Sequence, residues 1–164
     1  MLRPRAAISL SRVTDKHFQK ARDYAFLLLK FRLRSEKELL HRLKEKKFQV
    51  QVIHKVILFL KERKFLDDRE FARAWVASRA SRPLGPYRLR QELKLKGVNQ
   101  DIIDEELERL EGGSPEAETV SRIARVKFEK LCAREPEKAK RRIYEYLIRR
   151  GFSSSNVRDA LENL

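Results

Sequence analysis

Histidine and cysteine, which often bind metals or take part in catalysis, are few in this sequence, and their spacing matches no common site. No two of the histidines, His17, His41 and His54, stand at the i, i+3 or i+4 spacing that places metal ligands on one helical face. The single cysteine, Cys132, excludes an internal disulfide and any site of paired thiolates. No GxxxxGK[S/T] loop is present to hold phosphates. We therefore expect no metal, no cofactor and no enzymatic activity.

Two acidic features need no site to explain them. Asp67 and Asp68 precede an apolar helical period, where a carboxylate accepts backbone N–H bonds and complements the helix dipole. We interpret this pair as a helix cap. The acidic run from Asp101 to Glu111 lies beside Ile102 and Leu107, and we interpret it mainly as the solvated face of a helix.

The basic residues are the most informative class. The 164 residues include 39 Lys and Arg against 24 Asp and Glu, which gives a net charge of +15 and a pI of about 10.2. Residues 1–66 carry 18 basic and 6 acidic side chains, residues 67–113 carry 9 and 10, and residues 114–164 carry 12 and 8. The excess positive charges repel one another, and binding of an anionic partner relieves this repulsion. The charge indicates a polyanion, which is a nucleic acid, an acidic protein surface or both.

The elements that must position these charges are predicted to be helices. Only five Gly and five Pro occur, no segment alternates apolar and polar residues as a strand does, and apolar residues recur at intervals of three and four. Ser35 and Glu38 have capping-box spacing, and Gly97 and Gly151 suit the left-handed residue that closes a helix. The predicted helices span residues 15–33, 36–47, 50–64, 68–81, 86–96, 100–111, 115–133, 136–150 and 154–163.

Three segments of the chain repeat one pattern. They begin at Leu43, Leu93 and Leu147 and read LKEKKFQVQVIHKVI, LKLKGVNQDIIDEEL and LIRRGFSSSNVRDAL, with offsets of 50 and 54 residues. We predict an all-α fold, a tandem array of three three-helix repeats that forms an elongated, curved molecule. The predicted parts are a flexible N-terminal extension at 1–14 and repeats at 15–66, 67–113 and 114–164.

No apolar run approaches the ~18 residues that a membrane span requires, and the start MLRPRAAISLSRV is too interrupted for a secretion signal. A single cysteine also suits a reducing compartment. We expect a cytoplasmic protein that has no contact with membranes.

Residues 65–98 resemble the RecX family, whose members regulate the RecA recombinase. The family pattern [I/L]-D-D-x-x-[F/Y]-A is matched here by Leu66, Asp67, Asp68, Phe71 and Ala72. The pattern G-x-x-x-[I/L]-x-x-x-L-x-x-K-G-[I/V] follows, matched by Gly85, Leu89, Leu93, Lys96, Gly97 and Val98. The upstream segment SEKELLHRLKEKKF is similar to the family's first repeat, although Lys47 and Phe48 replace the Gly and Val of the middle repeat.

The resemblance implies a cytoplasmic modulator that binds the RecA–DNA filament along its groove and suppresses ATP hydrolysis, strand exchange and coprotease activity, and so acts on DNA repair and the SOS response. We also expect a monomer that binds DNA itself only weakly, non-specifically and through its phosphates. We expect Asp68, Phe71, Gly85 and Gly97 to serve folding. The predicted filament and DNA contacts are Arg32, Arg34, Lys37, Arg42, Lys44, Lys46, Lys47, Arg79, Arg82, Arg88, Arg90, Lys94, Lys96, Lys138, Arg141, Arg142, Arg149 and Arg150.

Two alternatives remain open from the sequence. A general DNA-binding protein built from tri-helical modules would present a helix of each repeat to a groove, but no recognition helix with Asn or Gln beside Arg is evident. An enzyme acting on nucleic acid would need a cluster of ligands, and the sequence contains none.

Overall fold

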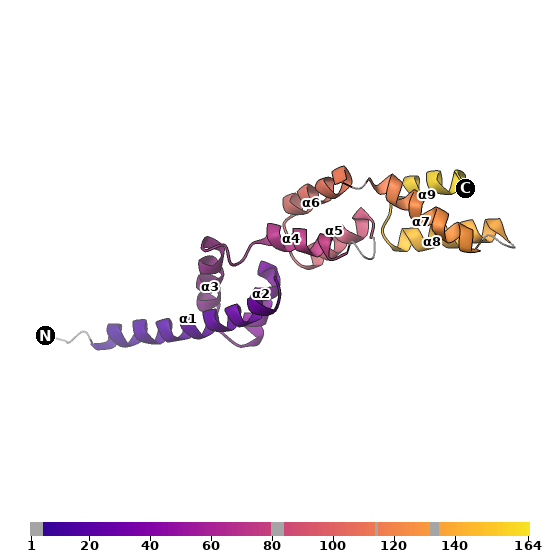
Figure 1. Cartoon of the computed structure of the whole chain (residues 1–164). Coiled ribbons are helices and arrows are strands. Elements are labelled where there is room, and N and C mark those ends of the chain that lie inside the picture. The colour runs from indigo at the N-terminus through magenta and orange to yellow at the C-terminus, as the bar shows by residue number, and fades with distance from the viewer. Residues whose placement is uncertain (1–4, 80–83, 114, 132–134) are drawn as a thin grey trace. The chain divides into compact units, whose positions relative to one another are not determined.

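Helices account for the regular structure of the chain, as the apolar spacing predicts. The computed structural model describes residues 5–79, 84–113, 115–131 and 135–164, with side chains from residue 15 onward; these residues form nine helices and no strand (Figure 1). The helices are α1 (Arg5–Phe31), α2 (Glu36–Glu45), α3 (Val50–Glu62), α4 (Asp68–Ala77), α5 (Pro86–Leu95), α6 (Gln100–Gly113), α7 (Glu116–Leu131), α8 (Pro136–Arg149) and α9 (Ser154–Glu162). The protein is a tandem array of helical repeats.

The first helix begins earlier than predicted. The sequence analysis places its start at residue 15 and a flexible extension before it, whereas α1 begins at Arg5. No glycine or proline occurs between Arg5 and Phe31, so nothing in the sequence interrupts the helix.

The chain divides into two compact units. Unit 1 comprises Met1–Phe71 together with Lys96–Val98, and unit 2 comprises Ala72–Leu95 together with Asn99–Leu164. In unit 1, α1 packs against α3, and α2 lies against both. The apolar stripes of these helices form one core, which consists of Ala21, Ala25, Leu28, Leu39, Leu43, Val52, Ile53, Val56, Ile57, Leu60 and Leu66.

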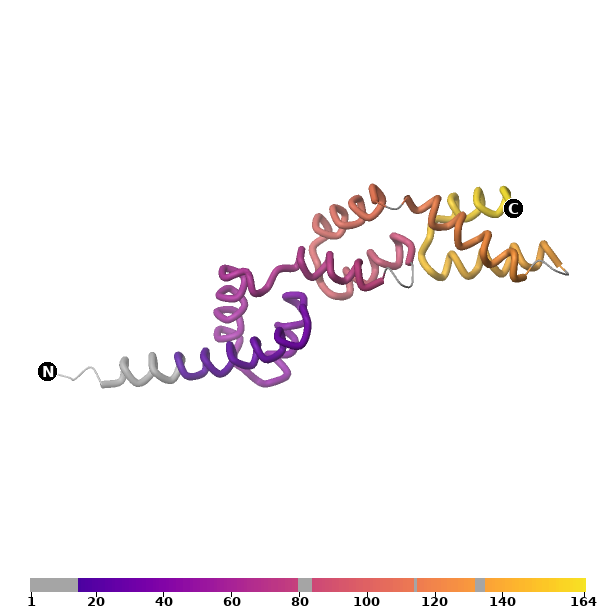
Figure 2. Tube along the Cα trace, in the orientation of Figure 1, coloured from indigo at the N-terminus to yellow at the C-terminus, as the bar shows by residue number. Residues whose placement is uncertain are grey.

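Unit 2 has two packed regions. Figure 2 shows α7, α8 and α9 running together in its C-terminal part, and each of these helices contacts the other two. Their core consists of Val120, Ala124, Ile143, Leu147, Phe152, Val157, Ala160 and Leu161. The other region pairs α5 with α6 and buries Leu89, Leu93, Ile103 and Leu107.

In unit 1, the chain that follows α5 seats against the first turn of α2. The Ser35 hydroxyl is fully buried; it accepts the Glu38 N–H at 3.2 Å and donates to the Lys96 carbonyl at 2.6 Å. The predicted cap of α2 is therefore confirmed, and its hydroxyl also binds the end of a helix in the next repeat. Gly97 follows with φ +79°, and a Cβ there would overlap the Lys37 side chain.

An equivalent junction occurs within unit 2. The Gly85 N–H donates to the Arg150 carbonyl at 3.0 Å, and the Tyr87 N–H donates to the Gly151 carbonyl at 3.1 Å. A Cβ at Gly85 would overlap the Gly151 backbone, and a Cβ at Gly151, where φ is +84°, would overlap the backbone of Arg88. The sequence offsets of 50 and 54 residues relate Ser35 to Gly85 and Lys96–Gly97 to Arg150–Gly151. Both junctions therefore join the same two positions of successive repeats.

Position 47 is the first repeat's counterpart of these glycines. Lys47 has the same left-handed backbone, with φ 61°, although it carries a side chain. That side chain is exposed, so a Cβ is accommodated here. The departure of Lys47 from the glycine pattern therefore leaves the helix end unchanged.

We expect Gly151→Ala to lower the free energy of unfolding by about 2 kcal/mol or more, because the new Cβ meets backbone atoms at a left-handed residue. Gly97→Ala should cost less, because the Lys37 side chain can shift. Lys47→Gly is the matched control, with an expected effect between zero and about 1 kcal/mol of stabilisation, because the same backbone is open there. Urea unfolding followed by circular dichroism measures the stability of all three variants. An equal loss of stability at positions 47 and 151 would contradict the close packing described for the junction.

Candidate functional site

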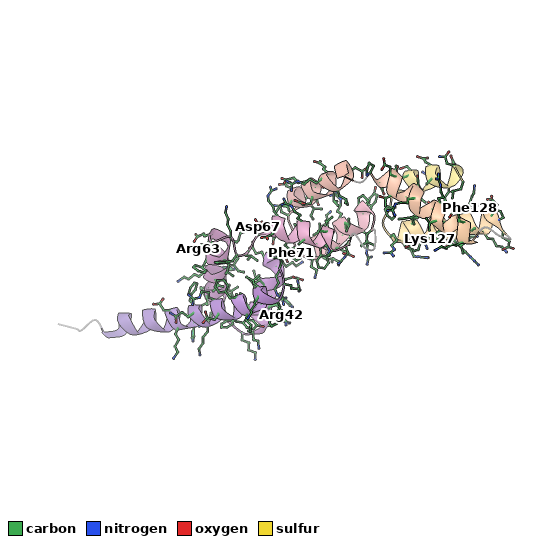
Figure 3. The ribbon with its side chains drawn as sticks, viewed as in Figure 1. Arg42, Arg63, Asp67, Phe71, Lys127 and Phe128 are labelled. Carbon is green, nitrogen blue, oxygen red and sulfur yellow. The ribbon has the colours of Figure 1, made fainter. Side chains whose placement is uncertain are left out.

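The paired aspartates cap two different helices. Asp67 precedes α4, and its Oδ1 accepts the Arg69 N–H at 2.8 Å, so the predicted cap is confirmed for this residue (Figure 3). Asp68 Oδ1 accepts the N–H of Glu36, the first residue of α2, at 2.8 Å. Leu66 and Phe71 are buried on either side of the pair. The motif thus fixes the start of α4 to the start of α2, a link between distant segments that sequence reasoning missed.

Burial raises the pKa of Asp68 above its ordinary value, because the charged carboxylate loses solvation. The hydrogen bond from the Glu36 N–H opposes this effect but does not cancel it. Among the described residues, no group of three or more His, Cys, Asp or Glu side chains is arranged to hold a metal ion. The aspartate pair is therefore explained by helix capping.

In the middle repeat, the carboxylate of Glu92 binds two of the predicted contact residues, Arg79 and Arg88. Glu92 accepts from Trp75 Nε1 at 3.0 Å and from Arg79 Nε at 3.2 Å, and Arg88 Nε lies 3.4 Å from its other oxygen. The Arg79 guanidinium also covers the Trp75 ring, 4.1 Å from its centroid. Arg79 thus packs within the middle repeat, which makes it a poor candidate for a phosphate contact.

The acidic run of α6 is not simply a solvated face. Glu106 is only 5% exposed, and it binds Arg109 at 2.8 Å and Arg73 at 3.5 Å. Asp104 pairs with Arg90, and hydrogen bonds from Gln100 and Arg90 lower the pKa of Asp104. The expectation of solvent exposure is therefore wrong for Glu106, because α4 and α6 supply arginines that compensate its burial.

Unit 1 contains a similar carboxylate in Glu38. It binds Arg32 at 2.9 Å and Lys96 at 2.6 Å. Burial works against its ionisation, but the two cations outweigh burial and lower the pKa of Glu38. Because Lys96 precedes Gly97, this ion pair lies directly beside the buried Ser35 junction.

The predicted contact residues separate into groups by what their side chains touch. Eight make an ion pair within their own unit: Arg32, Arg42, Arg79, Arg88, Arg90, Lys96, Lys138 and Arg141. Three others are occupied differently: Arg34 donates to the Leu28 carbonyl, Lys46 lies over the Tyr24 ring, and Arg150 bonds the Tyr146 hydroxyl. Lys37 and Lys94 are exposed, and Arg82 lies outside the described residues.

Four predicted residues are exposed and form no ion pair or hydrogen bond through their side chains with any described residue: Lys44, Lys47, Arg142 and Arg149. These are the best-placed cations of the original set for an external anion. Sequence reasoning also passed over Lys16, Lys20 and Lys30, which are exposed on α1. Their recurrence along one helix is the signal that would have found them.

In its described part, the chain is built of three-helix units in tandem, and no group of side chains there could hold a metal ion. The repeated units define a helical-repeat protein. Residues 21–60, 67–107 and 115–161 match the family models for the first, second and third three-helix domains of RecX, respectively. The chain belongs to the RecX family of regulatory proteins.

Similar proteins extend over most of the chain. The regulatory protein RecX of Chlorobium phaeobacteroides is 34% identical over 153 residues, which are 93% of this chain and 98% of that protein. RecX of Bacillus licheniformis is 38% identical, but this match covers 90% of the chain and 54% of that longer protein. The crystal structure of RecX from Lactobacillus salivarius has the same fold, with a TM-score of 0.81 at 20% identity, covering 92% of this chain and 97% of that one. None of the helices in the described part of the chain has the length and apolar character of a bilayer span.

We expect Asp68→Asn and Asp68→Ala to differ. Asparagine retains the acceptor for the Glu36 N–H, whereas alanine removes it and should cost about 1 kcal/mol of stability. The raised pKa of Asp68 gives the wild type stability that is present below the ordinary aspartate pKa and is lost as pH rises through the folded-state pKa. The Asn variant lacks this loss, so its stability relative to wild type should rise from acidic to neutral pH. Urea unfolding across that range tests the sign; a relative stability that falls would refute it.

Proposed function

We propose that this protein binds the RecA–DNA filament and inhibits its recombinase, ATPase and coprotease activities, thereby modulating DNA repair and the SOS response. The observation that carries the proposal is the match of three successive segments to the three RecX domains in order. The net charge of +15 supports an anionic target. The protein would act in the cytoplasm as a monomer.

The proposed mechanism is steric and electrostatic. Exposed cations of separate repeats would engage DNA phosphates and acidic patches of the filament, and the bound protein would block protomer addition, conformational cycling or access of a second DNA. Contacts made by linked repeats reinforce one another through effective concentration, so weak individual contacts suffice. Lys44 and Lys47 in the first repeat and Arg142 and Arg149 in the third are the cations best placed for this role.

Titration with salt tests the proposal against general DNA binding. We expect weak binding to naked DNA that falls steeply with salt, with a slope of about 0.9 in log affinity against log salt for each phosphate neutralised. Binding to RecA filaments formed with ATP should persist at salt concentrations that remove binding to naked DNA, and it should reduce ATP hydrolysis. Equal affinity and equal salt resistance for naked duplex would favour a general DNA-binding protein instead.

We expect the double charge reversal Arg142→Glu with Arg149→Glu to weaken inhibition of filament ATPase by about tenfold while leaving helical content unchanged, because these exposed side chains have no ion pair to lose within the described protein. Reversing the exposed acid Glu118 to Lys on α7 is the matched control and should preserve inhibition. Inhibition assays at one salt concentration, with circular dichroism for each variant, make the comparison. Full inhibition by the double variant would exclude this part of α8 from the contact surface.

By contrast, reversal of Arg90 or Lys96 should lower stability, because each reversed charge would face a carboxylate, Asp104 or Glu38. These two cations are therefore unsuited to a test that must leave the fold intact.

A further inference from the structure

One face of α1 carries a row of apolar side chains that unit 1 covers only at its N-terminal end. Tyr24, Leu27 and Phe31 follow one another at i, i+3 and i+7, so they lie along one side of the helix. Leu27 is 51% exposed and Phe31 is 77% exposed, while Tyr24 is half-buried. We call these three residues the α1 stripe.

The stripe differs from the other aromatic side chains around it. Phe18 stacks edge-on against Phe59, and Phe26 does the same with Phe65, with ring centroids 5.9 and 5.0 Å apart. These pairs attach the opposite side of α1 to the chain around α3. The ring centroids of Tyr24 and Phe48 are 6.3 Å apart, so the stripe begins against the segment that follows α2. It becomes more exposed towards Phe31. Large apolar side chains grouped in this way on a surface mark an interaction site.

The charges around the stripe are mostly positive. Lys16 and Lys20 are exposed on the turns before Tyr24, Lys30 is exposed beside Phe31, and the Lys46 ammonium lies 5.4 Å from the centroid of the Tyr24 ring. Asp23, the acid nearest the stripe in sequence, is bonded to Arg22 at 3.0 Å. The partner surface that complements this face is apolar at its centre and acidic at its rim.

We infer that the α1 stripe is the docking site for an acidic amphipathic helix on the recombinase. The inference rests on the proposed function and assigns part of the filament contact to protein, whereas charge alone leaves open whether the partner is DNA or an acidic protein surface. Apolar side chains spaced by three and four residues match the anchors of a helix laid along another helix. A second copy of this chain would bring lysines against lysines, and the aliphatic Leu27 offers a base no ring to stack on.

Photo-crosslinking from position 31 identifies the occupant. A photoreactive benzoylphenylalanine replaces Phe31 in the full chain, and the variant is mixed with RecA filaments on single-stranded DNA and irradiated. We expect a crosslink to a recombinase peptide rich in Asp and Glu. A crosslink to DNA or to a second copy of the chain would overturn the inference, as would the absence of any crosslink from a variant that still binds the filament.

Paired substitutions give an independent readout. Leu27→Ser with Phe31→Ser should weaken filament binding by about 30-fold, because buried aromatic anchors dominate interface affinity, while binding to naked DNA stays unchanged. The matched control is Val126→Ser with Leu131→Ser on α7, where the side chains are 47% and 44% exposed; it should change filament affinity by less than about threefold. Equal filament affinity for the stripe variant and wild type would overturn the docking site while leaving the proposed function intact. Failure of the wild type itself to bind filaments would overturn both.

Discussion

The structure depends on how the carbonyl groups at the end of the second helix are satisfied in the second and third repeats. A helix leaves its last carbonyls without partners, and a buried carbonyl must find a donor. Here the preceding repeat supplies it, through the Ser35 hydroxyl to Lys96 and through the Gly85 N–H to Arg150. One junction lies inside unit 1 and the other inside unit 2. The chain therefore meets the same requirement with a side chain once and with its backbone once.

Ion pairing decides which cations are available to a partner. Glu38, Glu92 and Glu106 each hold at least two basic groups, and together with Asp104 they engage most of the positive charge of the middle repeat. A carboxylate that is largely buried between two cations fixes the packing of its helices more than it attracts a ligand. Formal charge along the sequence is therefore a poor guide to the charge that a polyanion meets.

Local features were predictable from the sequence, and distant pairings were not. The cap at Ser35, the cap at Asp67 and the closing glycines depend on residues within a turn of one another, so spacing alone identifies them. The predicted start of α1, at residue 15, was placed close to Phe18, the first residue of the apolar period that faces the core. A helix needs only residues that permit it, and α1 begins at Arg5. The ion pairs join residues as far apart as the 58 positions between Glu38 and Lys96, and only helix packing brings such residues together.

Lys47 shows how the junctions constrain the residue at their left-handed position. At Gly151 the backbone of a neighbouring repeat leaves no room for a Cβ, and at Gly97 a Cβ would displace the Lys37 side chain, whereas Lys47 adopts the same backbone in the open. A gene duplication that inserted another such repeat ahead of the first would bring a helix terminus against this lysine. Replacement of Lys47 by glycine would relieve that contact. The identity of this one residue therefore limits whether another repeat can pack ahead of the first.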